Sequence, residues 1–289
     1  MTDAAIVHED ATNLDVDPSS IVWRRSSDPR LICAAGYALL LQVGHPTIGA
    51  GVKQFSDYAT DPWSRLVRTA DYVYVMIYGG AERAREQGKQ LREMHKRIQG
   101  VRPDGQRYHA LEPQPFAWVH ATLADAVIRA NELFVGPMTD DDKHAFYREF
   151  RRLGALHGVR ERDLPPDWAG FRAYFDDMVE HHLEDNPAVQ DLLDTRSPGT
   201  PPGMSERLWS LARTPTTWTL RLTGRGMLPP ILRERFGVPW TASDARWFPI
   251  IARAVRMPTP LLPSWFRITG PTYMRHRDRF MAGFHRRDT

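Results

Sequence analysis

A helical hairpin that turns at Gly79-Gly80 constrains the fold of this chain more than any other stretch of its sequence. The first arm begins at Asp61-Pro62, where a capping carboxylate followed by proline in the first turn is a strong helix start. The second arm follows the two glycines and runs to about Arg97. Because the corner between the arms is so short, the two helices are expected to fold back on one another as an antiparallel pair.

Several cations and one imidazole fall at the same depth of this hairpin. Opposed positions in the pair have residue numbers that sum to about 159, so Arg65 and Arg68 lie level with the end of the second arm. That end carries Arg92 and His95, which are three residues apart and therefore share a helix face. Such a group can hold an anionic cofactor with an open metal position, although spacing alone also fits ordinary packing and solvated arginines. The apolar wall around the charges favours a cofactor: Leu66, Val67, Tyr72, Val73, Met76, Leu91 and Met94.

The rest of the chain is also predicted to be helical. No stretch shows sustained period-two alternation, and no Asn-Gly or Asp-Gly turn joins two β-rich runs. Prolines, glycines and capping residues divide the remainder into predicted helices at 28–44, 47–58, 115–134, 139 to about 154–158, and 167–183, followed by several shorter helices. The sequence therefore predicts an all-α protein.

The length of 289 residues suffices for one large domain. Residues 1–20 are polar and aperiodic, which predicts a flexible segment, and residues 21–289 are expected to form a single helical domain. The proline- and glycine-rich loop 195–203 is a possible internal boundary.

Composition excludes several classes of function. A net charge of +3 is too small to indicate nucleic-acid binding. Cys33 is the only cysteine, which excludes disulfides and cysteine-based zinc or iron–sulfur sites within one chain, and its apolar surroundings predict a buried, inert thiol. The N-terminus lacks the pattern of a signal peptide, and the apolar run 31–41 is too short to span a bilayer, so a cytoplasmic protein is expected.

Two other histidine-bearing segments have simple interpretations. Adjacent histidines in Glu180-His-His-Leu-Glu184 point about 100° apart on a helix, so this segment predicts a solvated face rather than a metal site. The basic, amphipathic stretch 275–287 could contact an anionic membrane, although a helix that packs Phe280 and Phe284 inward is the favoured interpretation.

The order and spacing of several motifs resemble one oxygenase family, which contains rubber oxygenase (latex-clearing protein) and the fungal mycophenolic-acid-pathway oxygenase MpaB. The segments that carry the resemblance are Gln42-Val-Gly-His-Pro46, Arg65-Leu-Val-Arg-Thr69, Arg92–Gly100, Asp104-Gly105 through Tyr108, Trp118–Thr122 and Leu228–Gly237. The similarity covers most of the chain after residue 25 and is most specific before residue 125.

This resemblance implies a globin-like helical core with additional helices that binds one haem b per chain. In the family's pattern, the histidine of the Arg-x-x-His motif is the proximal iron ligand, which falls on His95 with Arg92 as its motif partner. A distal segment of the rubber enzymes falls on Arg65, Arg68 and Thr69. The implied activity is that of an oxidoreductase, because the rubber-cleaving members cut isoprenoid double bonds with molecular oxygen.

The chain departs from the rubber enzymes at two places. Arg68 replaces a lysine that can ligate iron, and a guanidinium stays protonated, so the resemblance implies an iron left open for oxygen. Arg68 could also stabilise negative charge on bound oxygen. Between His45 and Trp63 there is no glutamate to match the family's catalytic one, only Asp57 and Asp61.

For two further histidines, the sequence leaves two possible roles open. His45 either lies in the distal pocket as an acid, base or hydrogen-bond donor, or caps the helix that follows Pro46. His120 lies on an apolar helix, where a hydrogen-bonded core histidine is favoured over a contact with haem.

The sequence thus predicts a haem b-dependent oxygenase that acts on an apolar, isoprenoid or olefinic small molecule with molecular oxygen. Two alternatives remain open from the sequence. One is a haem-free helical protein that binds a lipid or terpenoid, and the other is a haem oxidase that dehydrogenates its substrate.

Overall fold

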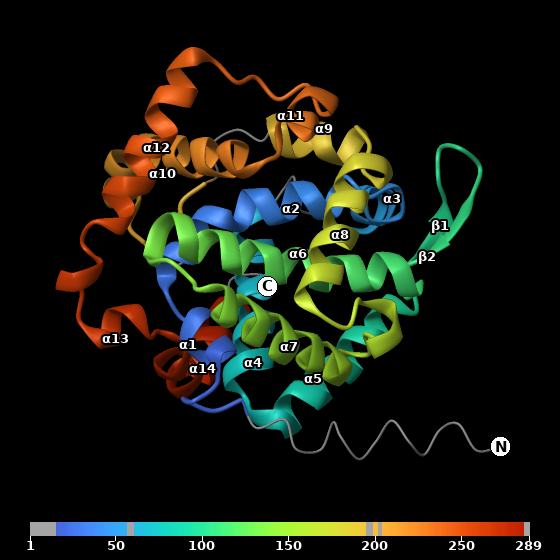
Figure 1. Cartoon of the computed structure of the whole chain (residues 1–289), viewed down its shortest axis with the longest axis horizontal. Helices are drawn as coiled ribbons and strands as arrows, with labels where there is room; N and C mark the ends of the chain where they lie inside the picture. The colour runs from blue at the N-terminus through green and yellow to red at the C-terminus, as the bar shows by residue number, and fades with distance from the viewer. Residues whose placement is uncertain (1–15, 57–60, 195–198, 202–203, 286–289) are drawn as a thin grey trace.

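Helices form nearly all of the regular structure in the computed structural model, which describes residues 16–56, 61–194, 199–201 and 204–285 (Figure 1). The prediction of an all-α protein is confirmed. The α-helices before the loop near residue 200 are α1 (Ile21–Arg25), α2 (Ala35–Val43), α3 (Pro46–Phe55), α4 (Pro62–Tyr78), α5 (Gly80–His95), α6 (Pro113–Ala130), α7 (Asp140–His157), α8 (Trp168–Asp177) and α9 (Pro187–Asp194). Those after it are α10 (Glu206–Met227), α11 (Pro230–Arg235), α12 (Ala242–Arg256), α13 (Ser264–Arg267) and α14 (Gly270–His285).

Short turns of other helix types extend several of these elements. Helices α6 and α8 each end in a π-helical turn, and a 3-10 turn precedes α2, so the predicted helices 28–44, 115–134 and 167–183 are each composed of two helix types. These turns are η2 (Pro29–Ala34), η3 (Asn131–Val135), η4 (Glu161–Asp163), η5 (Met178–His182) and η6 (Thr259–Leu261).

Helices α2 and α6 lie at the centre of the molecule, in contact with one another (Figure 1). Tyr37 on α2 and Trp118 on α6 are fully buried, and the Trp118 indole donates to the Leu41 carbonyl at 2.9 Å. The Tyr37 hydroxyl donates to the buried Asp125 carboxylate at 2.6 Å. These bonds satisfy polar groups inside an otherwise apolar core, as burial requires.

The predicted hairpin is confirmed as helices α4 and α5, which pack against one another. The Asp61 carboxylate accepts from the Ser64 amide at 3.0 Å and caps α4. Gly80 adopts a φ of +79°, a left-handed conformation that costs little only for glycine, and this residue makes the corner possible.

The expectation that the chain contains no β-hairpin is wrong at one place. Strands β1 (Gln99–Val101) and β2 (Arg107–His109) pair antiparallel, with Gly100 opposite Tyr108, around the Asp104-Gly105 turn. The strands are three residues long, too short to show a period-two pattern in the sequence. Gly105 supplies the positive φ of +85° that the turn needs.

The expectation of several shorter helices after residue 203 is wrong for α10, which has 22 residues and continues through Pro215. A proline removes one hydrogen bond from a helix, but packing on both sides of it can hold the helix together. Trp209 packs edge-to-face on Trp63 at 5.7 Å between ring centroids, before the proline. After it, Gly224 approaches Gly36 of α2 so closely that an added Cβ would lie 3.3 Å from the Gly36 Cα.

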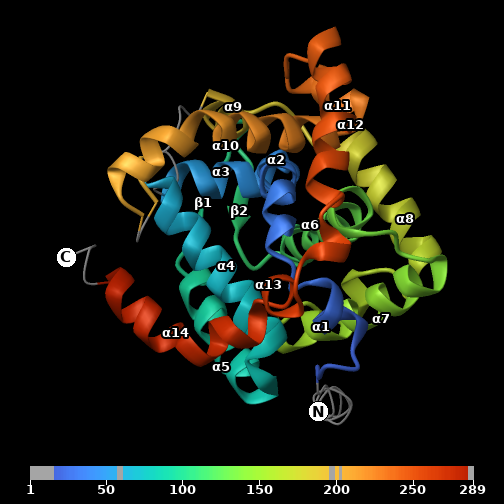
Figure 2. The same cartoon turned by 90° about the vertical axis from the view of Figure 1, so that its left-hand side faces the viewer.

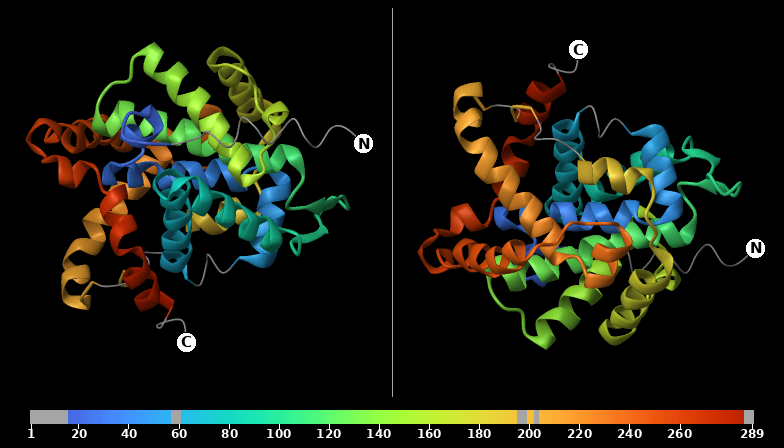
Figure 3. Two further views of the ribbon diagram at one scale, coloured as in Figure 1. Left: turned by 90° about the horizontal axis from the view of Figure 1, so that it is seen from below. Right: turned by 90° about the horizontal axis from the view of Figure 1, so that it is seen from above.

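The last helix, α14, packs against the first half of the chain. Helix α14 packs on α4, where the Arg277 guanidinium and the Tyr273 hydroxyl both donate to the Asp71 carboxylate. Figure 2 shows α14 beside the lower part of α4, and Figure 3 shows α10, α12 and α14 on the left-hand side of both views. Phe280, expected to pack inward, contacts Tyr273 but remains 43% exposed.

Some expectations lie outside the described residues. They concern the flexible segment, of which 1–15 are not described, the end of the 47–58 helix, Asp57, most of the boundary loop 195–203, and the Phe284 side chain. Cys33 is buried as predicted, and burial raises the pKa of its thiol to about 11. Among the described helices, no single one combines the length and apolar character needed to cross a bilayer.

Candidate functional site

His95 is the last residue of α5, and its ring is held in one tautomer. The Nδ1–H donates to the carbonyl of Leu91, one turn earlier, at 2.8 Å. The Nε2 atom therefore carries the lone pair that a metal would use. Burial and the nearby positive charge of Arg65 lower the pKa of His95, which favours the neutral imidazole. The ring also meets Phe116 edge-to-face, at 6.0 Å between centroids.

Arg65 and His95 lie close together across the hairpin, as their predicted common depth requires. Arg65 donates to the Ser56 hydroxyl at 2.7 Å, and its charge is near enough to lower the pKa of His95. The Thr69 hydroxyl donates back to the Arg65 carbonyl at 2.9 Å, within α4. Arg68 is exposed on the same helix, and its charge adds to the Ser64 hydrogen bonds that lower the pKa of Asp61.

The side chains of Arg92 and His95 contact different neighbours, although the two residues are only three positions apart on α5. Its side chain packs over Gly158, the left-handed cap of α7, where an added Cβ would lie 2.8 Å from the Arg92 Cδ. Burial raises the pKa of Tyr72, and the Arg92 charge opposes that rise. Burial lowers the pKa of His157, and the charges of His120 and Arg92 lower it further. Arg92 thus joins α5 to α4 and α7 at the level of the hairpin.

Tyr72 and His157 form a buried pair that sequence reasoning missed. Tyr72 lies two helical turns after Arg65, so the two share a face of α4, and its hydroxyl is hydrogen-bonded to Nδ1 of His157 on α7. The rings meet edge-to-face at 5.0 Å. Burial lowers the pKa of His157 to about 3, and its Nε2 is buried without a hydrogen-bond partner among the described residues.

The structure distinguishes the interpretations of His45 and His120 by their contacts. His45 caps α3: its Nδ1 accepts from the Thr47 amide at 3.2 Å, and burial lowers its pKa to about 4. His120 lies in the core between α6 and α7, where its Nε2–H donates to the Phe150 carbonyl at 2.7 Å. The contact of His45 matches its interpretation as a helix cap, and the contact of His120 matches its interpretation as a hydrogen-bonded core histidine. A role toward oxygen or haem remains a prediction for both residues.

The described segments hold no cluster of three or more histidine, cysteine, aspartate or glutamate side chains that could bind a metal ion. In the Glu180–Glu184 segment, both histidines are exposed and His182 pairs with Asp177 at 3.2 Å. Among the described residues, a metal at the candidate site would therefore have at most two ligands of these types, His95 being one, and His109 is near enough to affect the pKa of His95.

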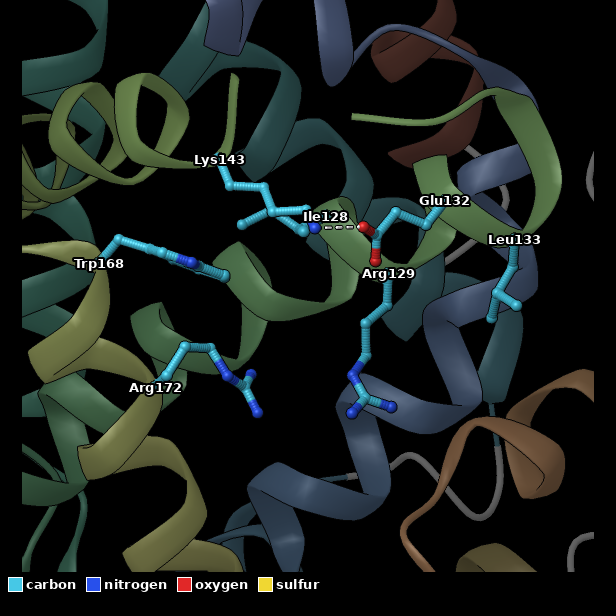
Figure 4. A pocket seen from close by; sticks show the side chains of 7 residues that line it. All are labelled: Ile128, Arg129, Glu132, Leu133, Lys143, Trp168 and Arg172. Atoms are coloured by element: carbon cyan, nitrogen blue, oxygen red, sulfur yellow. Dashed lines mark ion pairs between the residues drawn. The ribbon is translucent and has the colours of Figure 1, made fainter. Parts of the chain in front are cut away.

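A cavity of about 320 Å³ lies elsewhere, at the end of α6 (Figure 4). Its three cations face carboxylates: Lys143 contacts Glu132 at 2.7 Å, while Arg172 and Arg129 contact Asp125 at 2.7 and 3.2 Å. None of the predicted site residues lines this cavity. The cations of this cavity are largely neutralised by these carboxylates, so the cavity has little net charge with which to bind an ionic ligand.

Comparisons with known proteins found one matching family model and two related proteins. A family model described as "ER-bound oxygenase mpaB/B'/Rubber oxygenase, catalytic domain" matches residues 23–257. Uncharacterized proteins of Mycobacterium tuberculosis and Mycobacterium bovis are each 25% identical over 230 residues, which are 78% of this chain and 87% of each relative. No solved structure matches the chain significantly.

Proposed function

This chain belongs to the mpaB/rubber oxygenase family, and we propose that it is a haem b-dependent oxygenase whose iron is held by His95. The substrate class is an apolar, isoprenoid or olefinic small molecule that reacts with molecular oxygen. The observation that carries the proposal is the hydrogen bond from the His95 Nδ1–H to the Leu91 carbonyl, because it directs the Nε2 lone pair away from the helix backbone.

The residues around His95 fit a haem in three respects. A single neutral imidazole is the ligand that haem iron takes from histidine. Arg65, beside His95, can pair with a carboxylate of the macrocycle. Leu66, Val67 and Val73 on α4 are only half-buried, so they offer apolar surface to a planar, apolar group.

Each residue has a task in the proposed reaction. Haem, when bound, would supply the activation of oxygen. Leu91 fixes the tautomer of His95, Arg68 carries a permanent positive charge on the same helix as Arg65, and the apolar side chains of α4 would exclude water. Tyr72 on α4 and His157 on α7 form a hydrogen-bonded pair that could hold or pass a proton.

The first test is the visible spectrum of protein purified from cells supplied with a haem precursor. We expect a Soret band and iron stoichiometric with the chain. His95→Ala should lose both, while His181→Ala, at an exposed histidine on the surface, should keep both. A wild-type protein without extractable haem would overturn the proposal, and an unchanged His95→Ala spectrum would require a different ligand.

The second test follows oxygen into the product. Incubation of the haem-loaded protein with isoprenoid substrates under labelled dioxygen should cleave a double bond into two carbonyl groups that carry the label, because this cleavage takes up both oxygen atoms and needs no reductant. A dehydrogenated product without label would instead identify an oxidase on the same haem, and the oxygenase part of the proposal would be wrong.

A further inference from the structure

The C-terminal helices carry most of the exposed apolar side chains in the described part of the chain. Of sixteen large apolar residues that are exposed, twelve lie between Met204 and Phe280. The most exposed are Leu261 at 86%, Leu211 at 79%, Met257 at 73% and Trp265 at 72%. Single apolar residues on a surface are ordinary, but such a concentration indicates an interaction site.

These residues form stripes rather than isolated spots. Exposed apolar residues recur at helical spacing on both α10 and α12, so each helix presents one apolar face to solvent. The residues are Leu208, Leu211 and Trp218 on α10, and Trp247, Ile250 and Met257 on and just after α12. Trp218 and Trp247 join the two stripes, because their rings meet edge-to-face at 6.1 Å.

The apolar surface continues beyond α12 through η6 and α13. Leu261, Trp265 and Phe266 are all exposed there. In Figure 1 this segment lies at the left edge of the molecule, and in Figure 2, where that side faces the viewer, α12 and α13 stand in front. We call the surface of α10, α12, η6 and α13 the C-terminal face.

The same part of the chain is strongly basic. Residues 204–285 contain thirteen arginines, no lysine and only four acidic residues, whereas the whole chain has a net charge of +3. The segment alone carries +9, so the rest of the chain is net negative. Six arginines on or next to the helices that carry the apolar stripes are exposed: Arg207, Arg213, Arg246, Arg253, Arg256 and Arg267.

We propose that the C-terminal face binds the surface of a lipid bilayer that contains anionic lipids. Exposed tryptophan, leucine and isoleucine suit the boundary between head groups and acyl chains, and arginines beside them suit anionic head groups. A second copy of this chain is a poorer partner, because a two-fold contact would set one basic surface against another. No described helix could span the bilayer by itself, so the face lies on the membrane rather than across it.

The C-terminal face borders α4, which carries the proposed oxygen site. Trp63 at the start of α4 packs on Trp209 of α10. An apolar substrate dissolved in the bilayer would therefore be held next to the start of α4. This step rests on the proposed function, whereas binding to the bilayer does not.

The binding test compares sedimentation with vesicles of phosphatidylcholine alone and of equal parts phosphatidylcholine and phosphatidylglycerol. We expect binding mainly to the anionic vesicles, weakened by salt. Arg246→Gln combined with Arg253→Gln should lower that binding by roughly 30-fold. The matched control, Arg148→Gln with Arg162→Gln, removes two exposed arginines from the region of α7 and should leave binding unchanged.

A fluorescent label tests which surface enters the bilayer. Cys33 is buried and its thiol pKa is raised, so a cysteine introduced at Leu261 can be labelled selectively with an environment-sensitive dye. Its emission should shift to the blue on anionic vesicles, and the same dye on Arg148→Cys should not respond. Trp265→Ala with Leu261→Ala should lower binding at least about tenfold while leaving the circular dichroism unchanged.

Three outcomes would overturn this proposal. They are no binding to anionic vesicles, an equal loss in the α7 control, and a protein dimer that Trp265→Ala abolishes without any vesicle binding. His95→Ala should bind vesicles as the wild type does. Failure of the haem proposal and failure of the membrane proposal are therefore separable.

Discussion

Three histidines inside this protein are neutral because they are buried. Burial lowers the pKa of His45 and His120 to about 4 and that of His157 to about 3. Each ring makes a hydrogen bond that suits a neutral imidazole. His45 accepts from the Thr47 amide, His120 donates to the Phe150 carbonyl, and His157 is hydrogen-bonded to the Tyr72 hydroxyl. The folded state therefore excludes three protons that an unfolded chain would bind in mild acid.

We expect the free energy of unfolding to fall steeply in mild acid. The unfolded chain binds protons at these histidines below about pH 6.5. The folded chain does so only near the lowered pKa values of about 4, 4 and 3, so the loss runs from pH 6.5 down to about 4. Each histidine contributes up to about 1.4 kcal/mol per pH unit, or about 4 kcal/mol per unit together. Urea unfolding measured between pH 8 and pH 5 checks this slope.

A substitution isolates the share of one histidine. His157→Phe keeps an aromatic ring on α7 but removes the proton site, so the slope should fall by about a third. His144→Gln changes an exposed histidine on the same helix and should leave the slope as in the wild type. Equal slopes in wild type and His157→Phe would show that folding does not lower the pKa of His157.

At the level of the elements, α5 is positioned by its close contact with α7. Gly88 lies on the buried face of α5, where an added Cβ would sit 2.5 Å from the Leu156 carbonyl oxygen and 2.9 Å from the His157 Cα. Both neighbours are backbone atoms, which cannot move aside independently. The glycine therefore fixes the distance between the two helices, and His95 follows two turns later on the same face.

Gly88→Ala should push α5 away from α7 and lower stability by about 1–3 kcal/mol. Under the proposed function, it should also weaken haem retention, because His95 moves with its helix. Thermal unfolding and the ratio of Soret to protein absorbance measure the two effects. Lys89→Ala, at the exposed neighbouring position, is the control, and a Gly88→Ala protein as stable as this control would show that the helices adjust without cost.

Local sequence signals predicted the helices more accurately than they predicted the contacts between helices. Pro62, the Asp61 cap and the glycine corner were enough to predict α4 and α5, because each acts within one helical turn. The sequence predicted only shorter helices after residue 203, and it did not predict the length of α10 because contacts with distant helices hold that helix together. The Tyr72–His157 pair joins residues 85 positions apart, and no local pattern in either helix could have shown it.

At the scale of the whole molecule, the buried carboxylate of Asp71 holds the C-terminal helix α14 against α4. Asp71 on α4 accepts two hydrogen bonds from Arg277 at 2.6 and 2.8 Å and one from Tyr273 at 2.7 Å. A second contact nearby has the same effect, since the Thr269 hydroxyl donates to the Ser27 carbonyl at 2.7 Å. The C-terminal helices are thereby held against α4 and the start of the chain.

Arg277→Ala should cost about 2–3 kcal/mol, because it leaves the buried Asp71 carboxylate without its charge partner. The Asp71 side chain is only 8% exposed, so water cannot replace the arginine easily. Adding Asp71→Asn should recover part of this loss, since no unpaired charge then remains, and urea unfolding at pH 7 measures both. Arg279→Ala, exposed on the same helix, should change stability by less than about 0.5 kcal/mol. If Arg277→Ala costs no more than Arg279→Ala, the ion pair does not hold α14 on α4, and the apolar contacts between the helices must do so alone.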